Sequence, residues 1–232
     1  MDLTPRTVLV IGASRGIGAA VTQHLAALGH RVFAVSRTPA AVGHGIPADI
    51  STPQGLQSIK AALGDTPLDA LLFMGGVWEE GAFTEAYDFA RSTDAETRWV
   101  IAVNTIAPIE LTRLLADNLA ATANPRAIYM GSRSGLDHCA SVEVANTASK
   151  FGLRGAVQAL RLALADRRYG QKIGFTVINP GNVATAEVLL DIAEGRFPPQ
   201  QPIPMADLLA TIDWLMGLSP MVDVPEVNLF QR

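Results

Sequence analysis

A glycine-rich turn near the N-terminus constrains the fold of this chain more than any other feature. A short apolar run, Val8–Ile11, leads into Gly12-Ala13-Ser14-Arg15-Gly16-Ile17-Gly18, and a helical pattern continues to Leu28. Glycine permits a tight turn, lets a ligand approach the backbone and lets the helix pack closely on the strand. The free N–H groups of the helix N-terminus carry a partial positive charge that suits phosphate. The turn is therefore predicted to bind a dinucleotide through Gly12, Ser14, Arg15, Gly16, Ile17 and Gly18.

Short apolar runs alternate with helical patterns along the rest of the chain. Strands are predicted at Val8–Ile11, Arg31–Ser36, Gly45–Ala48, Ala70–Met74, Ala127–Met130 and Gly174–Ile178. Helices are predicted at Gly16–Leu28, Pro53–Leu63, Glu96–Leu119 and Ala145–Ala165. Such alternation indicates βαβ units and a parallel sheet covered on both faces. We expect an α/β fold with a single Rossmann-type, doubly wound parallel sheet of about seven strands and helices on both faces.

Length and composition favour one domain over residues 1–232. Hydrophobic residues make up 49% of the chain, enough for a large core. The proline-rich stretch Phe197–Pro204 resembles a linker, but only 28 residues follow it, too few for an independent core. We therefore interpret that stretch as a loop.

Charge and cysteine content exclude several classes of partner. A net charge of −4 argues against nucleic acid, which needs a basic surface. The single cysteine, Cys139, permits no internal disulfide and is typical of a reducing compartment. No uninterrupted apolar run reaches the roughly 18 residues of a membrane span, and no signal peptide is recognisable. The expectation is a cytoplasmic protein with a small-molecule substrate, without a membrane, nucleic-acid or metal partner.

Several motifs together resemble the short-chain dehydrogenase/reductase family over nearly the whole chain. They are the Gly-x-x-x-Gly-x-Gly spacing, Asp49-Ile50, Asn104, Ser132, Ala148-Ser149-Lys150 and Asn179 to Thr185. The resemblance implies that Asp49 contacts the adenine and that the stretch from Pro180 to Thr185 holds the nicotinamide carboxamide. Two alternatives remain open, a helix N-cap role for Asp49 or Ser51 and an ordinary turn at Pro180-Gly181. Further cofactor contacts implied by the family are Ile50, Gly75, Gly76, Asn104, Lys150, Pro180, Gly181, Val183 and Thr185.

The end of the second predicted strand indicates which dinucleotide is bound. A site for NAD places a carboxylate there to bind the ribose hydroxyls, whereas this chain has Ser36-Arg37-Thr38. Arg37 suits a 2′-phosphate because its donors form a planar fork, and the two hydroxyls add hydrogen bonds. Arg15 in the glycine turn is a second cation. The predicted cofactor is NADP(H).

The catalytic set implied by the resemblance is incomplete. The family uses Asn, Ser, Tyr and Lys, with the tyrosine hydroxyl as the general acid or base. Asn104, Ser132 and Lys150 match three of these, but the position four residues before Lys150 is Asn146. No tyrosine lies between Tyr129 and Lys150. An amide supplies no proton near neutral pH, although Asn146 is able to donate a hydrogen bond to an oxyanion.

His138 is the candidate replacement for the missing acid. It lies between Ser132 and Asn146, in a loop that lines the substrate pocket in the family, and its ordinary pKa suits proton transfer near neutral pH. The alternative is an exposed loop residue. Tyr129 is expected in the core. The fourth strand also departs from the family, with Phe73-Met74-Gly75-Gly76 in place of Asn-Asn-Ala-Gly.

Three functions remain open at this stage. The first is an NADP(H)-dependent oxidoreductase with an atypical active site that acts on a carbonyl or hydroxyl of a small, partly apolar substrate. The second is a non-redox enzyme on the same fold, such as a cyclase, isomerase or dehydratase. The third is a non-catalytic subunit of an assembly. The segment at about 186–205 is the expected substrate loop, with Trp78 and Phe83 as pocket-wall or core residues. The family resemblance implies a homo-oligomer, a dimer or tetramer, or an assembly with a catalytically complete relative.

Overall fold

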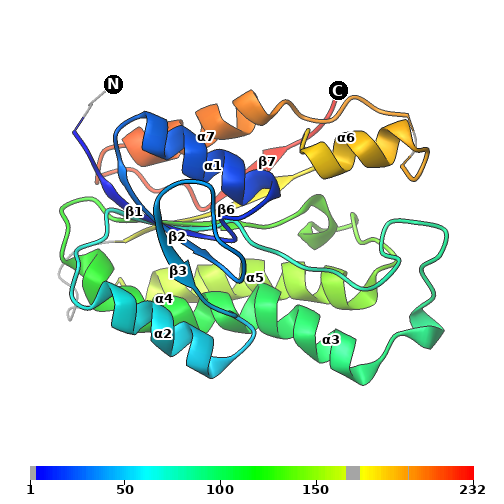
Figure 1. Cartoon of the computed structure of the whole chain (residues 1–232), viewed down its shortest axis with the longest axis horizontal. Coiled ribbons are helices and arrows are strands. Elements are labelled where there is room, and N and C mark those ends of the chain that lie inside the picture. The colour runs from blue at the N-terminus through cyan, green and yellow to red at the C-terminus, as the bar shows by residue number, and fades with distance from the viewer. Residues whose placement is uncertain (1–3, 166–172, 198) are drawn as a thin grey trace.

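A seven-stranded parallel sheet forms the centre of the computed structural model, which describes residues 4–165, 173–197 and 199–232. The strand order is β3-β2-β1-β4-β5-β6-β7 (Figure 1). Strands β1 to β3 are therefore added toward one edge of the sheet and β4 to β7 toward the other, and the order reverses between β1 and β4. This confirms the predicted Rossmann-type α/β fold. The strands are β1 (Thr7–Ile11), β2 (Arg31–Ser36), β3 (His44–Pro47), β4 (Ala70–Phe73), β5 (Arg126–Met130), β6 (Gly174–Pro180) and β7 (Glu226–Leu229).

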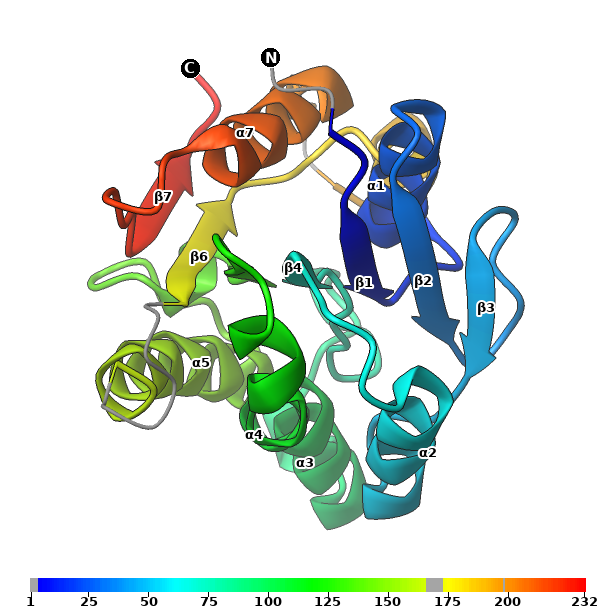
Figure 2. The ribbon, with the colours of Figure 1, turned by 90° about the vertical axis from the view of Figure 1, so that its left-hand side faces the viewer.

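Helices cover both faces of the sheet, as Figure 2 shows end-on. α1 (Gly16–Ala27) and α7 (Met205–Gly217) pack on one face, and α2 (Pro53–Leu63), α4 (Ala107–Ala120) and α5 (Val144–Ala163) pack on the other. Strand side chains alternate between the two faces. Leu9 and Ile11 of β1 join the core on the α2–α4–α5 side, while Val8 and Val10 join the core on the α1–α7 side. Burial on both faces explains why β1 is a continuous apolar run.

The predicted helix at Glu96–Leu119 is longer than expected and contains an irregular turn. α3 (Asp94–Ile101) continues through a π-helical turn, Ala102–Ile106, into α4. Asn104 lies in this turn and is 2% exposed. A π-helical turn widens the helix locally and is common at functional sites.

By length and composition, one helical segment among the described residues, Asp94–Ala120, is apolar enough to cross a membrane, with a mean hydropathy of 1.3 in its best window. This segment contains polar residues between its apolar ones, so it is not one of the uninterrupted apolar runs considered in the sequence. Half of the window is buried inside the fold, and Leu111, Leu115 and Leu119 lie in the core beside the sheet. The core helix of a folded domain passes the same test, so this segment is a weak indication of a membrane span.

The C-terminal third contains elements that the sequence patterns did not place. The expected substrate loop at 186–205 begins with a helix, α6 (Ala186–Ala193), whose first turn is capped by the Thr185 hydroxyl accepting from Val188 N–H. Pro198 within that loop lies outside the described residues. α7 and the edge strand β7 follow. β7 was missed because it is short and only partly buried, so it lacks a strong apolar pattern.

The glycine turn brings β1, α1 and β4 unusually close together. A side-chain carbon on Gly12 would lie 2.5 Å from Gly75 Cα, and one on Gly18 would lie 2.1 Å from the Gly12 carbonyl oxygen. Gly12 also has a φ of +85°, which favours glycine. Gly18 thus has the packing role expected of the third glycine, while Gly12 permits the turn.

We predict that Gly18→Ala lowers the free energy of unfolding by at least about 1–3 kcal/mol, because the added methyl group overlaps backbone that cannot easily move. Gly155→Ala in α5 is the matched control. A carbon there meets nothing within 4 Å, so the better helix former should stabilise by up to about 1 kcal/mol. Urea unfolding measures both changes, and an unaltered midpoint for Gly18→Ala would contradict the packing argument.

Candidate functional site

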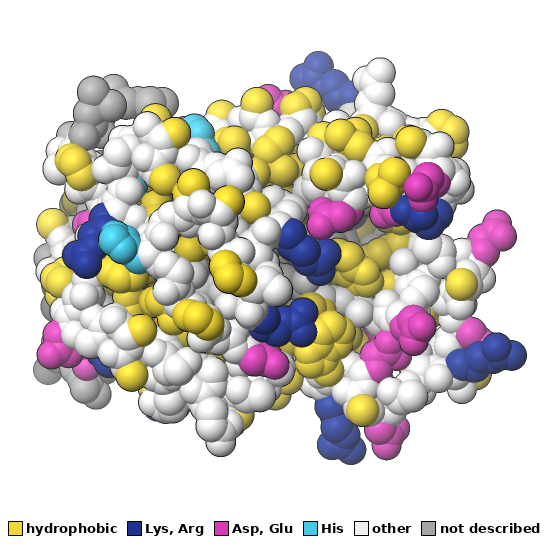
Figure 3. Space-filling model, viewed as in Figure 1, with side chains coloured by type: hydrophobic (Ala, Val, Ile, Leu, Met, Phe, Trp, Pro, Cys, Tyr) yellow, Lys and Arg dark blue, Asp and Glu magenta, His cyan; other side chains and the backbone are white. Residues whose placement is uncertain are grey.

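A cavity of about 350 Å³ lies at the carboxyl ends of the strands and is called the main cavity below. Ligands of open α/β sheets bind at this edge, where the strand order reverses. Figure 3 shows a hollow with hydrophobic side chains inside it and charged side chains around its rim. The predicted cofactor residues that line the main cavity are Gly12, Ser14, Arg15, Gly16, Ile17, Ser36, Arg37, Asp49, Ile50, Gly75, Gly76, Lys150, Pro180, Gly181, Val183 and Thr185.

The glycine turn fits the phosphates of a dinucleotide. Gly12 and Gly75 both line the main cavity, and without side chains they let a ligand approach the backbone closely. α1 begins after Arg15, and the side chain of this N-cap residue makes no hydrogen bond to the first turn. Its N–H groups are therefore available to an anion, and the helix dipole favours negative charge there.

The region after β2 and β3 has the polar groups expected near an adenosine. Ser36 and Arg37 line the main cavity, while Thr38 lies just outside its lining and accepts a hydrogen bond from the Ser36 hydroxyl through its carbonyl. Asp49 Oδ1 accepts from Ser51 N–H (2.9 Å) and Ser51 Oγ (2.7 Å). These hydrogen bonds lower the pKa of Asp49, so its carboxylate stays charged at neutral pH.

The helix cap before Pro53 is Thr52, and not Asp49 or Ser51. Thr52 Oγ1 accepts from Gly55 N–H at 3.1 Å, in the position of a standard N-cap. The alternative N-cap role for Asp49 or Ser51 is therefore wrong.

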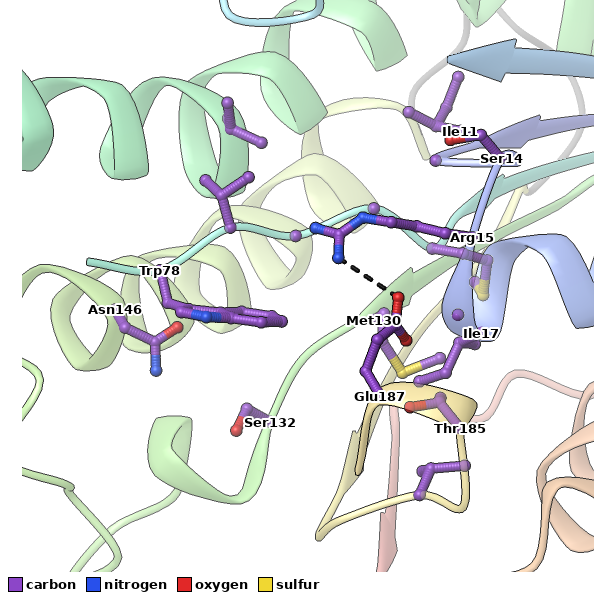
Figure 4. A pocket seen from close by; sticks show the side chains of 18 of the residues that line it. Ile11, Ser14, Arg15, Ile17, Trp78, Met130, Ser132, Asn146, Thr185 and Glu187 are labelled. Carbon is purple, nitrogen blue, oxygen red and sulfur yellow. Dashed lines mark hydrogen bonds and ion pairs between the residues drawn. The ribbon is translucent and has the colours of Figure 1, made fainter. Parts of the chain in front are cut away.

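An ion pair crosses the main cavity at the glycine turn. Arg15 Nη1 lies 3.4 Å from Glu187 Oε1 of α6 (Figure 4). Both side chains are about half exposed or more, at 64% and 48%, so the pair adds little to stability. Neither helical periodicity nor motif spacing predicts this contact, because 172 residues separate the partners.

Ser132, Asn146 and Lys150 line the opposite end of the main cavity. Ser132 Oγ accepts from Ser134 Oγ at 2.9 Å, and Asn146 Nδ2 donates to the same Ser134 oxygen at 3.4 Å. Figure 4 shows Asn146 and Ser132 at one end of the cavity, beside Trp78, and Arg15 and Glu187 at the other. Ser134 therefore connects the two polar side chains.

Lys150 is the cation at the inner end of the main cavity. It is 7% exposed, and its Nζ donates to the Met130 carbonyl at 3.0 Å. Burial lowers the pKa of Lys150 to about 8, from an ordinary value of 10.5, because a charged ammonium loses hydration there. Lys150 is thus able to exchange a proton near neutral pH.

Asn104 holds the chain that follows β4 but does not line the main cavity. Its Oδ1 accepts from Val77 N–H at 2.9 Å, and its Nδ2 donates to Val77 O at 2.7 Å and to Ser149 Oγ at 3.0 Å. These contacts use the side-chain oxygen and both amide hydrogens of Asn104. The unfavourable mid-helix asparagine is therefore explained by the segment it positions.

His138 is exposed and is not among the residues that line the main cavity. Its φ is +62°, an uncommon value for a residue with a side chain. Tyr129 is fully buried, with its hydroxyl 2.6 Å from Thr112 Oγ1, and burial raises its pKa. Tyr129 is therefore a core residue, as predicted.

Two buried carboxylates were missed by the sequence analysis. Glu79 is 2% exposed, and its Oε1 accepts from the N–H groups of Ala145 (2.7 Å) and Asn146 (3.2 Å) at the start of α5. Glu143 is 3% exposed, and its Oε1 accepts from Phe83 N–H at 2.8 Å. In the sequence both glutamates lie in predicted loops, where acidic residues are usually exposed, so nothing in the sequence indicated that they are buried.

The fold and the glycine cradle define a doubly wound dinucleotide-binding type of protein. The family model described as short chain dehydrogenase matches residues 6–190. The chain therefore belongs to the short-chain dehydrogenase family, whose related members are reductases and dehydrogenases.

Curated relatives are 28% to 31% identical to this chain over the aligned residues. A rhamnolipids biosynthesis 3-oxoacyl-[acyl-carrier-protein] reductase of Pseudomonas aeruginosa is 31% identical over 195 residues, which are 78% of this chain and 73% of that protein. The L-xylulose reductase of Homo sapiens is 30% identical over 195 residues, 79% of this chain and 74% of that one. The ketoacyl reductase HetN of Nostoc sp. is 28% identical over 204 residues, 82% and 67% respectively.

Solved structures share the whole fold. The 3-alpha-hydroxysteroid dehydrogenase of Pseudomonas sp. in complex with NADH has a TM-score of 0.75 at 22% identity, over 97% of this chain and 95% of that one. The Pseudomonas aeruginosa RhlG/NADP complex has a TM-score of 0.77 at 24% identity, over 97% and 94%. Relatives of this fold thus bind NADH in one case and NADP in the other.

We predict that the depressed pKa of Lys150 makes stability rise with pH. Between pH 8 and 10.5 the unfolded chain binds a proton that the folded protein has lost, so the free energy of unfolding increases with pH. The full rise is about 3 kcal/mol for a shift of this size. Urea unfolding of the protein and of Lys150→Met from pH 7 to 9.5 measures the difference. Parallel curves for the two proteins would contradict a buried, titrating Lys150.

Proposed function

We propose that this protein is an NADP(H)-dependent reductase of small, partly apolar carbonyl compounds, with an atypical proton donor. The observation that carries the proposal is the convergence on one cavity of the glycine turn with Arg15 and Arg37 and of the polar group Ser132, Asn146 and Lys150. The first set suits a phosphorylated dinucleotide, and the second suits a carbonyl oxygen. When bound, NADPH supplies the hydride.

The preference for NADP(H) rests on the two arginines. Arg37 is exposed immediately after β2, where it is able to approach a 2′-phosphate, and the segment Ser36-Arg37-Thr38 contains no acidic residue. Arg15 lies across the same end of the main cavity. A phosphate there also competes with Glu187 for Arg15, since both are anions within reach of one guanidinium.

We assign to Lys150 the proton that is transferred to the carbonyl oxygen of the substrate. Ser132 and Asn146 donate hydrogen bonds to the carbonyl oxygen and stabilise the negative charge that develops on it. Lys150 then releases a proton to that oxygen, directly or through one water, and its neutral amine regains a proton from solvent. Lys150 fits this role because it lines the cavity and its pKa is about 8, near the working pH of a general acid. His138 lies too far out on the surface to be preferred.

We predict that Arg37→Ala weakens NADPH binding by about tenfold or more, the effect of losing one charge-assisted hydrogen bond. NADH binding should stay the same, because NADH lacks the 2′-phosphate. Arg31→Ala is the matched control. Arg31 lies at the other end of β2 and stacks on Phe33 at 4.8 Å. Calorimetric titration measures the affinity of each variant for both dinucleotides. Equal losses of affinity for NADPH and NADH in Arg37→Ala would overturn the proposal that Arg37 binds the 2′-phosphate.

We predict that Asn146→Tyr raises the rate of carbonyl-dependent NADPH oxidation by up to about 10²-fold, the lower end of the usual value of a placed general acid, because Lys150 already supplies a proton in the unaltered protein. Asn146→Phe adds the same ring without the hydroxyl and should bring no gain. The assay follows NADPH absorbance with a panel of aldehydes and ketones.

The same assay identifies the proton source. In the unaltered protein kcat should fall as pH rises through about 8, because only the protonated lysine is an acid. A loss of turnover in His138→Ala, together with no fall of kcat near pH 8 in the unaltered protein, would assign the proton to His138 instead. No NADPH oxidation in either protein would count against a reductase. Product formation independent of the cofactor's oxidation state would then favour the non-redox alternative, and co-purification with a tyrosine-containing relative would favour the non-catalytic one.

Assembly is proposed through α4 and α5. Ile109 on α4 and Val144 and Phe151 on α5 are 37%, 46% and 36% exposed. Apolar side chains at such positions are suited to contact with another subunit. A dimer or tetramer by sedimentation equilibrium is the expected result.

A further inference from the structure

Aromatic side chains wall the main cavity next to Ser132 and Asn146. Trp78, Phe83, Trp99 and Phe197 all line it, and they come from three separate parts of the chain. Figure 4 shows the Trp78 indole beside Asn146. A flat group stacked on the Trp78 indole would therefore lie next to the polar side chains proposed to bind the carbonyl oxygen.

These rings are incompletely buried. Trp78 is 48% exposed and Phe83 is 38% exposed, and both face a cavity. Their ring centroids lie 5.8 Å apart at an interplanar angle of 66°, an edge-to-face contact. The edge-to-face pair leaves ring surface uncovered. Burying this surface against a ligand is favourable, since large aromatic side chains contribute strongly to binding.

The loop that carries Trp78 and Phe83 is held in place by buried polar groups. Asn104 binds both backbone groups of Val77. Glu79 accepts from the start of α5, and Glu143 accepts from Phe83 N–H. An aromatic wall fixed at three points is formed before any ligand arrives, which reduces the entropy lost on binding.

Phe83 adopts a strained backbone conformation at this wall. Its φ of +64° lies in the left-handed region, which is uncommon for a bulky residue. Such conformations cost on the order of 1–3 kcal/mol and concentrate at ligand sites. The hydrogen bond to Glu143 holds this conformation, and the Phe83 ring reaches Trp78.

A second hollow of about 850 Å³ adjoins the aromatic wall. It shares Phe83, Asn182 and Phe197 with the main cavity. Its remaining lining is largely polar and includes Thr84, Ser141 and Gln200. The rest of a ligand therefore has polar room beyond the rings.

We propose that the part of the main cavity lined by Trp78 and the neighbouring Phe83 binds a flat conjugated ring, so that the substrates are aryl or otherwise conjugated ketones and aldehydes rather than saturated ones. This inference rests on the proposed function, since it concerns the same cavity. It adds the chemical class of substrate. Stacking of a flat ring on aromatic faces gives a preference over a saturated ring of the same size.

The test compares acetophenone with cyclohexyl methyl ketone, which carry the same acetyl group on a flat and a puckered ring. Both are titrated calorimetrically into the protein saturated with NADP⁺, so that no reduction occurs. Acetophenone should bind about tenfold more tightly, the value of one good aromatic contact. Trp78→Ala should abolish this preference. Trp214→Ala is the control, because Trp214 is a 51% exposed tryptophan on α7 outside the lining of the main cavity.

Phe83→Asn is a second variant that keeps the left-handed backbone while removing the ring, since asparagine tolerates that conformation. It should reduce the preference as well. Equal affinities for the two ketones, or an undiminished preference in both Trp78→Ala and Phe83→Asn, would overturn the proposal. A ring preference without NADPH oxidation would sustain this inference and count against the reductase. Carbonyl-dependent oxidation of NADPH, with equal affinities for the two ketones, would support the reductase and overturn the preference for a flat ring.

Discussion

The close approach of two glycines, Gly12 at the end of β1 and Gly75 at the end of β4, is the constraint on which the rest of the structure depends. A side-chain carbon on Gly12 would lie 2.5 Å from Gly75 Cα, so Gly12 has no room for a side chain. This contact lies where the strand order reverses, between β1 and β4. It leaves the N-terminus of α1 open at the edge of the sheet, and an open helix N-terminus at a switch point is the physical basis of dinucleotide binding in this fold.

Buried polar groups also fix the end of the main cavity that is lined by Ser132 and Asn146. Asn104, Glu79 and Glu143 are each at most 3% exposed, and each accepts hydrogen bonds from backbone N–H groups of distant segments. Burying a carboxylate is costly unless it is hydrogen-bonded. Here the two glutamates receive donors from the start of α5 and from Phe83, and the N-terminal end of α5 favours the negative charge of Glu79. The result is a rigid loop that presents Trp78 and Phe83 to the cavity beside Asn146.

Much of the cofactor side was predictable because its determinants are local. Three short segments are recognisable from the spacing of their residues, namely the glycine turn, the basic end of β2 and the region from Ser132 to Lys150. Most of the residues predicted there line one cavity. The proposed proton donor was less predictable. His138 has suitable chemistry but is exposed, whereas Lys150, to which we assign the proton, acquires a pKa of about 8 only through burial. Burial depends on what packs around a residue, which spacing alone does not state.

The sequence by itself determined the fold class, the parallel βαβ order and the identity of the residues at the dinucleotide turn, because alternating apolar periodicity and glycine requirements act over a few neighbouring residues. It also determined that position 146 is asparagine. Only the tertiary structure decided that Glu79 caps α5 from 66 residues away, that Ser134 links Ser132 to Asn146, and that Arg15 pairs with Glu187. Such contacts depend on strand register and helix packing, which bring distant segments to one sheet edge and leave no periodic trace in the chain.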